Sequence, residues 1–181
     1  DRITLPKDYL NRHNISLKNI INRLNKFNKL RVCVLGDIII DEYVTCKALG
    51  MSREDPTIVV SPFHNTKFLG GAGIVAAHCA TLGSSVDLYG VLGSDENRNF
   101  TIKKSREYNI NLIELVDKNR PTILKKRYRI ENKNLLKVST LKDEIISTNL
   151  QNKIYNKIEK KINKYDLIIF SDFNYGCLPE I

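Results

Sequence analysis

Apolar residues recur at two spacings along the chain, and these spacings predict helices and strands. Ser16 precedes a stripe at steps of three and four residues (Leu17, Ile20, Ile21, Leu24, Phe27), which is typical of a capped amphipathic helix. We expect residues 1–29 to form an N-terminal helical extension or linker ahead of the main domain, residues 30–181. Isoleucine or leucine at every fourth position predicts a second helix over 145–163, and a shorter one is expected over 95–108.

Short, unbroken apolar runs indicate strands that are covered on both faces. The runs are VCVLG from Val32, VDLYGVLG from Val86 and DLIIFSD from Asp166, with a further strand around NLIEL. Between the first two lies GGAGIVAAHCATLG, which fits a small-residue helix ended by Gly83. Helices of crossover length that alternate with apolar strands predict an α/β fold, with a parallel sheet flanked by helices on both faces.

Two further segments have the pattern of antiparallel strands outside this sheet. Residues 43–69 contain the pieces YVTC, TIVVS and TKFL, separated by Gly50, SREDP and Pro62, and they predict a small β-flap. Residues 120–140 contain ILKKRYRIE and LLKVS around the turn-like ENKN, and they predict a hairpin. The chain lacks an initial Met and stops soon after a predicted central strand, so we expect the fold to be C-terminally incomplete.

The composition of the chain excludes several classes of function. The 181 residues carry 29 Lys+Arg and 20 Asp+Glu, a net charge of +9, yet the cations are dispersed, only 8% of residues are aromatic and Trp is missing, which argues against a nucleic-acid partner. No apolar run reaches the length of a membrane span and the start does not resemble a secretory signal, so we expect a cytoplasmic protein without membrane contact. The four Cys and three His show no metal-ligand spacing.

Carboxylates follow the first and last apolar strands, where open α/β sheets bind ligands. Asp37 and Asp41 share a face if the chain stays extended beyond Gly36, and carboxylates accept hydrogen bonds from sugar hydroxyls. The alternative is that Asp37 caps a turn and Asp41 is solvated. Ser171 and Asp172 end the last strand and should open at the same edge as Asp37.

Glycines precede the small-residue helix. Gly70, Gly71 and Gly73 would let backbone N–H groups approach a ligand, or they would only permit close packing. Gly71, Gly73 and Ala76 also fit a dinucleotide fingerprint, but the preceding TKFL is too short and polar for a buried first strand, so an NAD(P)-binding Rossmann enzyme is the weaker alternative.

A basic row lies in the predicted hairpin. On a strand, Lys125, Arg127 and Arg129 project to one face. Such a row binds phosphate if it overlies the ligand edge, and otherwise it is a charged, solvated sheet edge.

Taken in order, VLGDIIIDEY, SREDPTIVV, LGGAGIVAAHCATLG, VLGSDE, RPTILKKR and LIIFSDFNYG resemble the ribokinase-type (PfkB) carbohydrate kinases. The closest resemblance is to the heptose 7-phosphate kinase module of bifunctional proteins of ADP-heptose synthesis. It implies a ribokinase-like fold with a β-flap lid. It also implies phosphorylation of a sugar hydroxyl with ATP and Mg²⁺, in the heptose case the anomeric hydroxyl of a sugar phosphate.

The same resemblance implies roles for residues. Asp41 corresponds to the acceptor of the sugar hydroxyl, Gly70 and Gly71 to the glycine pair of the sugar site, and Ser52 and Glu54 to the lid. The family's catalytic base lies in a G-A-G-D segment, which is expected beyond Ile181, so no catalytic residue is assigned to this chain and we expect it to be inactive alone. A lid-mediated homodimer and a fused nucleotidyltransferase module are further expectations.

The sequence departs from the family's pattern in two ways. The family usually has Asn shortly after the glycine pair, where this chain has Ile74 and Val75, and the heptose kinases tend to have Lys at the position of Tyr175. These departures keep a non-catalytic sugar-binding or regulatory module as the alternative function.

Overall fold

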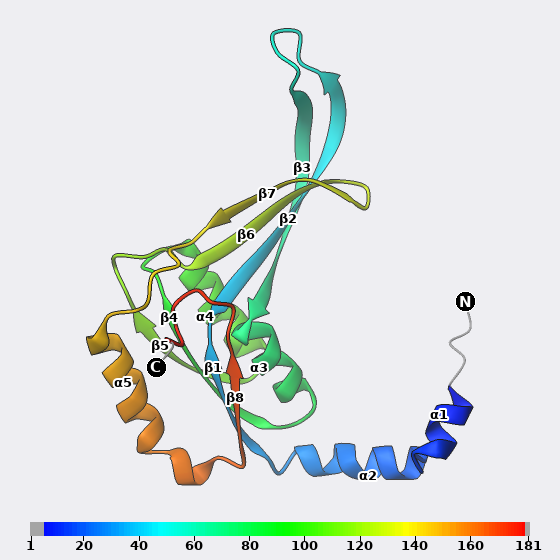
Figure 1. Ribbon diagram of the computed structural model, residues 1–181, viewed down its shortest axis with the longest axis vertical. Helices are drawn as coiled ribbons and strands as arrows, with labels where there is room; N and C mark the ends of the chain where they lie inside the picture. The colour runs from blue at the N-terminus through cyan, green and yellow to red at the C-terminus, as the bar shows by residue number, and fades with distance from the viewer. Residues whose placement is uncertain (1–5, 180–181) are drawn as a thin grey trace.

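A computed structural model describes residues 6–179, which form two four-stranded sheets with helices around one of them (Figure 1). The helices are α1 (Lys7–Arg12), α2 (Leu17–Phe27), α3 (Ala72–Thr81), α4 (Glu96–Glu107) and α5 (Thr148–Glu159), followed by a 3-10 turn at Ile162–Lys164. The strands are β1 (Arg31–Gly36), β2 (Ile38–Met51), β3 (Ile58–Gly71), β4 (Ser85–Leu92), β5 (Ile110–Val116), β6 (Ile123–Ile130), β7 (Lys133–Thr140) and β8 (Leu167–Ser171). The predicted fold class is confirmed.

The body is a parallel sheet in the order β5-β4-β1-β8 between two helical layers. Alternation along β1 builds both cores, because successive strand residues point to opposite faces. Val32 and Val34 pack towards α3 on one face, whereas Cys33 and Leu35 pack towards α5 on the other. All four are at most 7% exposed, as expected for a central strand.

β8 differs from the sequence-based expectation of a strand buried on both faces. Within residues 6–179 it pairs with β1 alone and forms the edge of the parallel sheet. Phe170 and Leu167 are 66% and 45% exposed. The apolar run DLIIFSD therefore correctly predicted a strand, but it did not predict that the strand would be partly exposed to solvent.

The second sheet, in the order β3-β2-β6-β7, is formed by the segments for which we predicted a lid, and we call it the lid. The expected three short pieces within 43–69 are instead two strands of 14 residues, which reach from Ile38 to Gly71 and rise far above the body (Figure 1). The register of this pair shifts at Cys46, which lies opposite Pro62, and again at Gly50. A β-bulge can accommodate a proline or a glycine within a strand. Pro62 and Gly50 therefore do not divide β3 and β2 into shorter strands.

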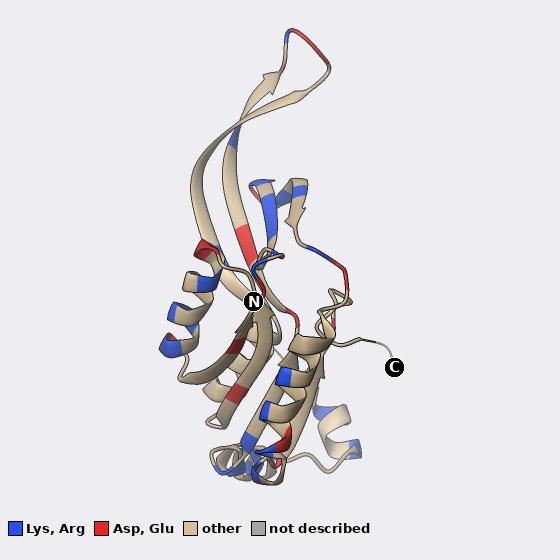
Figure 2. Cartoon of the chain, turned by 90° about the vertical axis from the view of Figure 1, so that its left-hand side faces the viewer, with Lys and Arg blue, Asp and Glu red and all other residues tan. Residues whose placement is uncertain are grey.

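The predicted hairpin at 120–140 is confirmed as β6 and β7, and it completes the lid sheet. β6 runs parallel to β2, so that Asp41 lies opposite Lys125 and Tyr43 lies opposite Arg127. This pairing brings the basic hairpin alongside the acidic start of the lid. Figure 2 shows acidic residues on β2 beside basic residues on β6.

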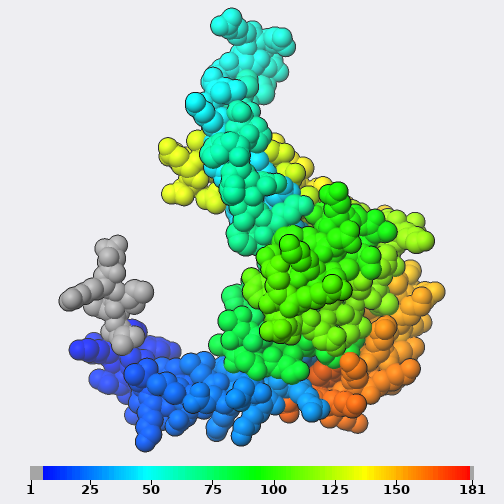
Figure 3. Space-filling model, turned by 180° about the vertical axis from the view of Figure 1, so that it is seen from behind, coloured from blue at the N-terminus to red at the C-terminus, as the bar shows by residue number. Residues whose placement is uncertain are grey.

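The helices follow their sequence signals with two differences. The Ser16 hydroxyl accepts from the Asn19 N–H at 3.1 Å and starts α2, yet no residue of α2 is buried, and α2 extends from the body (Figure 3). α5 begins at Thr148 rather than 145 because Ser147 caps it, and its periodic pattern continues into Ile146, which is buried ahead of the helix. None of the helices within 6–179 has the length and hydropathy to span a membrane.

Candidate functional site

The first strand of the lid and the glycines before α3 meet at Asp41. One oxygen of its carboxylate, Oδ1, forms an ion pair with the Arg127 guanidinium. The other oxygen, Oδ2, lies against Gly70 and accepts no hydrogen bond within the described part of the chain. The side chains of Asp41 and Arg127 are 24% and 21% exposed, so the pair is accessible from solvent. This ion pair raises the pKa of Arg127, which therefore remains a cation.

Gly70 and Gly71 are each required by a close contact. A Cβ on Gly70 would lie 2.3 Å from Asp41 Oδ2, so any side chain there would displace the carboxylate. A Cβ on Gly71 would lie 2.2 Å from the carbonyl oxygen of Asp37, and Gly71 has φ +53°. The Ala72 N–H donates to that same carbonyl at 2.9 Å. The acids after β1 and the paired glycines thus lie together, as the sequence predicted.

Asp37, another predicted substrate-binding residue, directs its carboxylate towards the loop after β8. Its side chain is almost fully buried, with the residue 2% exposed, and it accepts three backbone N–H bonds. Phe173 and Tyr175 donate to Oδ2 at 3.0 and 3.2 Å, and Cys177 donates to Oδ1 at 3.2 Å. A buried carboxylate is stable only when its oxygens are occupied in this way. Asp37 therefore fixes the loop after β8, which is close to the alternative that it caps a turn.

The basic row lies on one face of β6, as predicted, and that face looks towards the loop after β8. Lys125 Nζ lies 4.8 Å from the centre of the Tyr175 ring and 5.7 Å from that of Phe173. Arg127 and Arg129 each stack on the Tyr43 ring at 5.2 Å. The loop after β8 that donates to Asp37 (residues 173–178, here called the Asp37 loop) is thereby joined to the lid through Lys125, since cation–π contacts are attractive at these separations.

Lys126 lies on the opposite face of β6. Its Nζ is 3.3 Å from Glu42 Oε2, and Glu42 also accepts from the Asn65 amide at 3.1 Å. The alternation of Lys126 with its two neighbours is what places only Lys125 and Arg127 next to Asp41.

Four expected site residues lie elsewhere or have other contacts. Asp172 is exposed beside the Asp37 loop, and its carboxylate accepts from the Asn174 N–H at 2.8 Å. A Cβ on Gly73 would contact the Leu69 side chain at 3.3 Å, which fits the packing alternative. Ser52 and Glu54 bond to each other at the exposed lid tip, eleven or more residues along the hairpin from Asp41, or roughly 36 Å of strand. Within one chain they do not reach Asp41.

Arg120 was not recognised from the sequence, although it supports the site. Its guanidinium donates to the carbonyls of Tyr175 at 3.2 Å and Glu144 at 2.6 Å, and Nε lies 3.3 Å from Asp117. It is only 8% exposed. The only local signal is the turn-like DKNRP, which gives no indication that the arginine is buried. Arg120 thus holds the loop after β8 through the carbonyl of Tyr175.

Cys177, also in this loop, is not suited to nucleophilic chemistry. Burial, with a smaller contribution from the nearby Asp37 charge, raises the pKa of its thiol to about 12. The thiolate is the reactive form, and it is scarce at neutral pH. Nor do residues 6–179 bring together three metal-ligating side chains that would hold a metal ion. The site offers the free Oδ2 of Asp41, the two cations Lys125 and Arg127, and three aromatic rings beside them.

Comparisons with known proteins match both the sequence and the fold. No family model matches the chain. The bifunctional protein HldE of a Nitratiruptor species is 33% identical over 152 residues, and that of Helicobacter pylori (strain HPAG1) is 35% identical over 150 residues. These matches cover 84% and 82% of this chain, which spans about a third of the length of either relative.

Solved structures of sugar kinases share the fold. A carbohydrate kinase from Agrobacterium tumefaciens matches with a TM-score of 0.59 at 13% identity, and Arabidopsis thaliana ribokinase, complexed with ribose and ATP, with 0.54 at 18% identity. Each match covers 78% of this chain and 45% of the other. The chain has the ribokinase-type fold and resembles part of the HldE proteins. The resemblance drawn from the six sequence motifs is confirmed.

Proposed function

We propose that this chain is the sugar-binding part of an ATP-dependent carbohydrate kinase whose substrate is a sugar phosphate such as heptose 7-phosphate, phosphorylated at the anomeric hydroxyl. The observation that carries the proposal is the contact between Asp41 and Gly70. Because Gly70 has no side chain, Oδ2 of the Asp41 carboxylate can accept a hydrogen bond from a sugar hydroxyl at the foot of the lid.

The cations beside Asp41 support an anionic sugar. Lys125 and Arg127 lie on the face of β6 that looks towards the site, and neither is more than partly buried. A planar guanidinium and a mobile ammonium suit the oxygens of a phosphate group. In this proposal Asp41 holds a hydroxyl near the glycines, Arg127 orients Asp41, and Lys125 attracts the phosphate.

The nucleotide is proposed from the family alone. ATP supplies the transferred phosphoryl group and Mg²⁺ offsets its charge in such kinases. Residues 6–179 present no group of three metal-ligating side chains. We also propose that the 181-residue chain does not turn over by itself, because the family's G-A-G-D segment with the catalytic base is not among its residues. A fused nucleotidyltransferase module, a dimer formed through the lid and a cytoplasmic location are further parts of the proposal.

Calorimetric titration of the 181-residue chain with heptose 7-phosphate tests the proposed sugar site. Asp41→Ala is expected to lower the affinity about 10- to 150-fold, because it removes a charged hydrogen bond of about 1.5–3 kcal/mol. Asp55→Ala, which removes an exposed carboxylate at the lid tip, is the matched control and should leave the affinity unchanged.

Two results would contradict the proposal. If Asp41→Ala bound the sugar phosphate as tightly as the wild type, Asp41 would not be its hydroxyl acceptor. Efficient ATP-dependent phosphorylation by the 181 residues alone would contradict the proposed inactivity. Binding without turnover in a longer, complete protein would favour the non-catalytic sugar-binding alternative.

A further inference from the structure

Helix α2 presents a continuous apolar stripe to solvent. At 3.6 residues per turn, its five apolar side chains fall within an arc of roughly 120° on one side of the helix. None of them is buried, and Leu17, Ile21 and Leu24 are 73%, 47% and 42% exposed. The stripe consists of Leu17, Ile20, Ile21, Leu24 and Phe27. Single exposed apolar residues are common on protein surfaces, whereas a contiguous group of them marks an interaction surface.

The rest of α2 is basic or uncharged and contains no acid. Lys18, Arg23 and Lys26 lie outside the apolar arc and are exposed. None of the three forms an ion pair with any of residues 6–179. The positions between them are asparagines 19, 22 and 25. Cations and small polar groups around an apolar stripe are typical of a helix that lies in the interface of an anionic membrane.

The net charge of the chain is concentrated in the same segment. Residues 6–29 contain six basic residues and one acidic residue, Asp8, which gives a net charge of +5 out of +9 for the whole chain. The 152 residues 30–181 carry only +4, because acids there balance most of the cations. Two such extensions would repel each other, which disfavours a second copy of the chain as the partner. A negatively charged lipid surface would attract the extension.

The helix is placed so that a flat surface can reach it. The Phe27 carbonyl accepts from Ser84 Oγ at 3.0 Å, and the Leu30 carbonyl accepts from the Ser85 N–H at 2.9 Å, so the end of α2 is attached to the body. The remainder of α2 extends away from the body at the end opposite the lid (Figure 1, Figure 3). Contact through α2 therefore leaves the lid uncovered.

We propose that α2 docks this protein onto an anionic lipid surface, with the apolar stripe among the headgroups and with Lys18, Arg23 and Lys26 paired with lipid phosphates. The expectation of no membrane contact rested on the lack of an apolar span and of a secretory signal, and a helix that lies in the interface needs neither. The inference rests on α2 alone and does not depend on the proposed sugar chemistry.

Cosedimentation of the 181-residue chain with lipid vesicles tests the proposal. Phosphatidylcholine vesicles with about one quarter phosphatidylglycerol should bind the chain about tenfold or more tightly than vesicles of phosphatidylcholine alone. Raising the NaCl concentration from about 0.1 M to about 0.5 M should weaken this binding by a similar factor, because salt screens the cations. Leu17→Gln combined with Leu24→Gln should weaken it about tenfold or more, since it removes apolar area without changing the charge.

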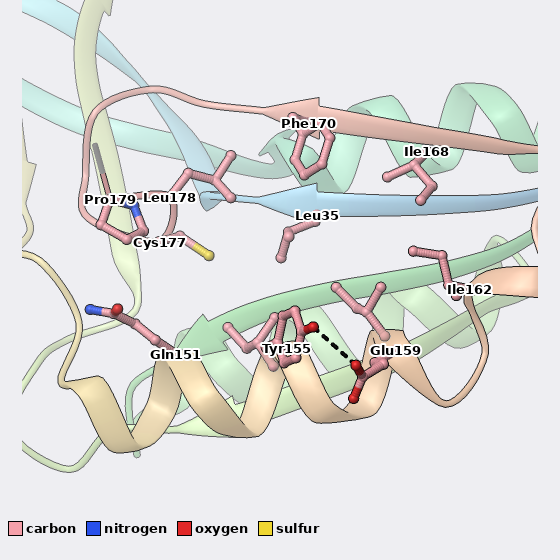
Figure 4. Close-up of a pocket in the computed structure, with 12 residues that line it drawn as sticks. Leu35, Gln151, Tyr155, Glu159, Ile162, Ile168, Phe170, Cys177, Leu178 and Pro179 are labelled. Atoms are coloured by element: carbon pink, nitrogen blue, oxygen red, sulfur yellow. Dashed lines mark hydrogen bonds between the residues drawn. The ribbon is translucent and has the colours of Figure 1, made fainter. Parts of the chain in front are cut away.

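The matched control combines Leu136→Gln with Phe170→Gln, two exposed apolar residues outside α2. Leu136 is 55% exposed on the lid. Phe170 is 66% exposed and lines the apolar groove between β8 and α5 (Figure 4). The control variant should bind the anionic vesicles as tightly as the wild type, because neither residue belongs to the stripe.

Fluorescence reports whether the stripe itself enters the lipid. The chain has no Trp, so one introduced indole gives the only Trp signal. Leu24→Trp places it at the centre of the stripe, and Asn22→Trp places it on the polar face, about 160° away around the helix. With anionic vesicles, the emission of Leu24→Trp should shift to shorter wavelength because the indole enters apolar surroundings, whereas that of Asn22→Trp should stay unchanged.

Several results would overturn the proposal. They are the absence of binding to anionic vesicles, equal binding to phosphatidylcholine alone, full affinity of the Leu17 and Leu24 double variant, and an equal loss in the control variant. Equal emission shifts at positions 22 and 24 would also contradict it. If the chain alone sediments as a dimer that the Leu17 and Leu24 double variant dissociates, a second copy covers the stripe and the proposal is wrong. A failure of sugar binding changes none of these readings.

Discussion

Gly70 leaves room for the carboxylate of Asp41, and the contact is so close that a single methyl group tests it. In Gly70→Ala the new Cβ would lie 2.3 Å from Oδ2, which forces the carboxylate out of its place. The backbone of Gly70 is outside the left-handed region, so alanine is conformationally acceptable there. We expect sugar phosphate affinity to fall about tenfold or more, while the free energy of unfolding changes by less than about 1 kcal/mol.

Calorimetry and urea unfolding measured on the same Gly70→Ala sample separate the two effects. Retained sugar affinity would show that the hydroxyl acceptor lies elsewhere. A large loss of stability would mean that Gly70 serves packing rather than the site.

Asp87 lies in a polar cluster on the body, away from Asp41. Its carboxyl group makes the stability of the folded protein depend on pH. Burial tends to raise the pKa of Asp87, but hydrogen bonds from Tyr165 at 2.6 Å, Asn111 at 2.7 Å and Lys161 at 3.0 Å outweigh it and hold the pKa below its usual value. A lowered pKa in the folded state stabilises the fold above the unfolded pKa of about 3.9, and this contribution is lost as the pH falls through the folded value.

Asp87→Asn should therefore reduce stability at pH 7 and flatten its decline between about pH 5 and pH 2. Urea unfolding at several pH values measures this, with the exposed Asp143→Asn as control. An Asp87→Asn protein that loses stability in acid as steeply as the wild type would assign the decline to other carboxylates.

At the scale of elements, Asp95 connects α4 to β6. Its Oδ1 accepts from the Arg98 N–H at 3.0 Å and caps α4, and its Oδ2 accepts from the Thr122 N–H at 2.7 Å. Asp95→Ala removes the cap and leaves the amide of Thr122 without its acceptor, and Thr122 is only 1% exposed. We expect a loss of about 2–3 kcal/mol in the free energy of unfolding, measured by urea denaturation.

Ser16→Ala provides a matched comparison, because Ser16 also caps a helix. α2 has no buried residues, so the loss should appear as reduced helix content and not as a shift of the unfolding midpoint. Equal shifts of the midpoint in both variants would show that α2 unfolds together with the body.

The elements that the sequence predicted well are those with a regular local pattern of apolar residues. Periodic apolar residues gave α2 and the centre of α5, and short apolar runs gave β1, β4 and β8. The lid was harder, because Gly50 and Pro62 normally interrupt strands and here sit in bulges of longer ones. The exposed side of β8 was not predictable, since an apolar run does not reveal which strands will pair beside it.

Some features of the candidate site could likewise be predicted from the sequence, and others could not. The proximity of Asp41 to the glycines followed from strand order, and the shared face of Lys125 and Arg127 followed from strand periodicity. The role of Asp37 did not follow, because its donors are backbone N–H groups 136 to 140 residues further along the chain. Backbone donors leave no signature in residue type, and neither does the buried position of Arg120.

At the scale of the whole molecule, the N-terminal extension is separate from the body. The Phe27 carbonyl accepts from Ser84 Oγ at 3.0 Å, but no side chain of α1 or α2 is buried (Figure 3). A chain of residues 30–181 should therefore unfold with a free energy within about 0.5 kcal/mol of the full chain. Urea denaturation of the two chains measures this, and a clear loss on deletion would indicate that α2 packs against the body.

The buried carboxylate of Asp37 also constrains how the protein is made. Asp37 leaves the ribosome long before Phe173, Tyr175 and Cys177, which supply its hydrogen bonds. β1, β4 and β5 can associate with α3 while those residues are still untranslated, but a desolvated charge without donors opposes closure around Asp37. The loop after β8 can thus be fixed only once Cys177 has been made, and a nascent chain that stops short of Cys177 would keep the carboxylate of Asp37 hydrated.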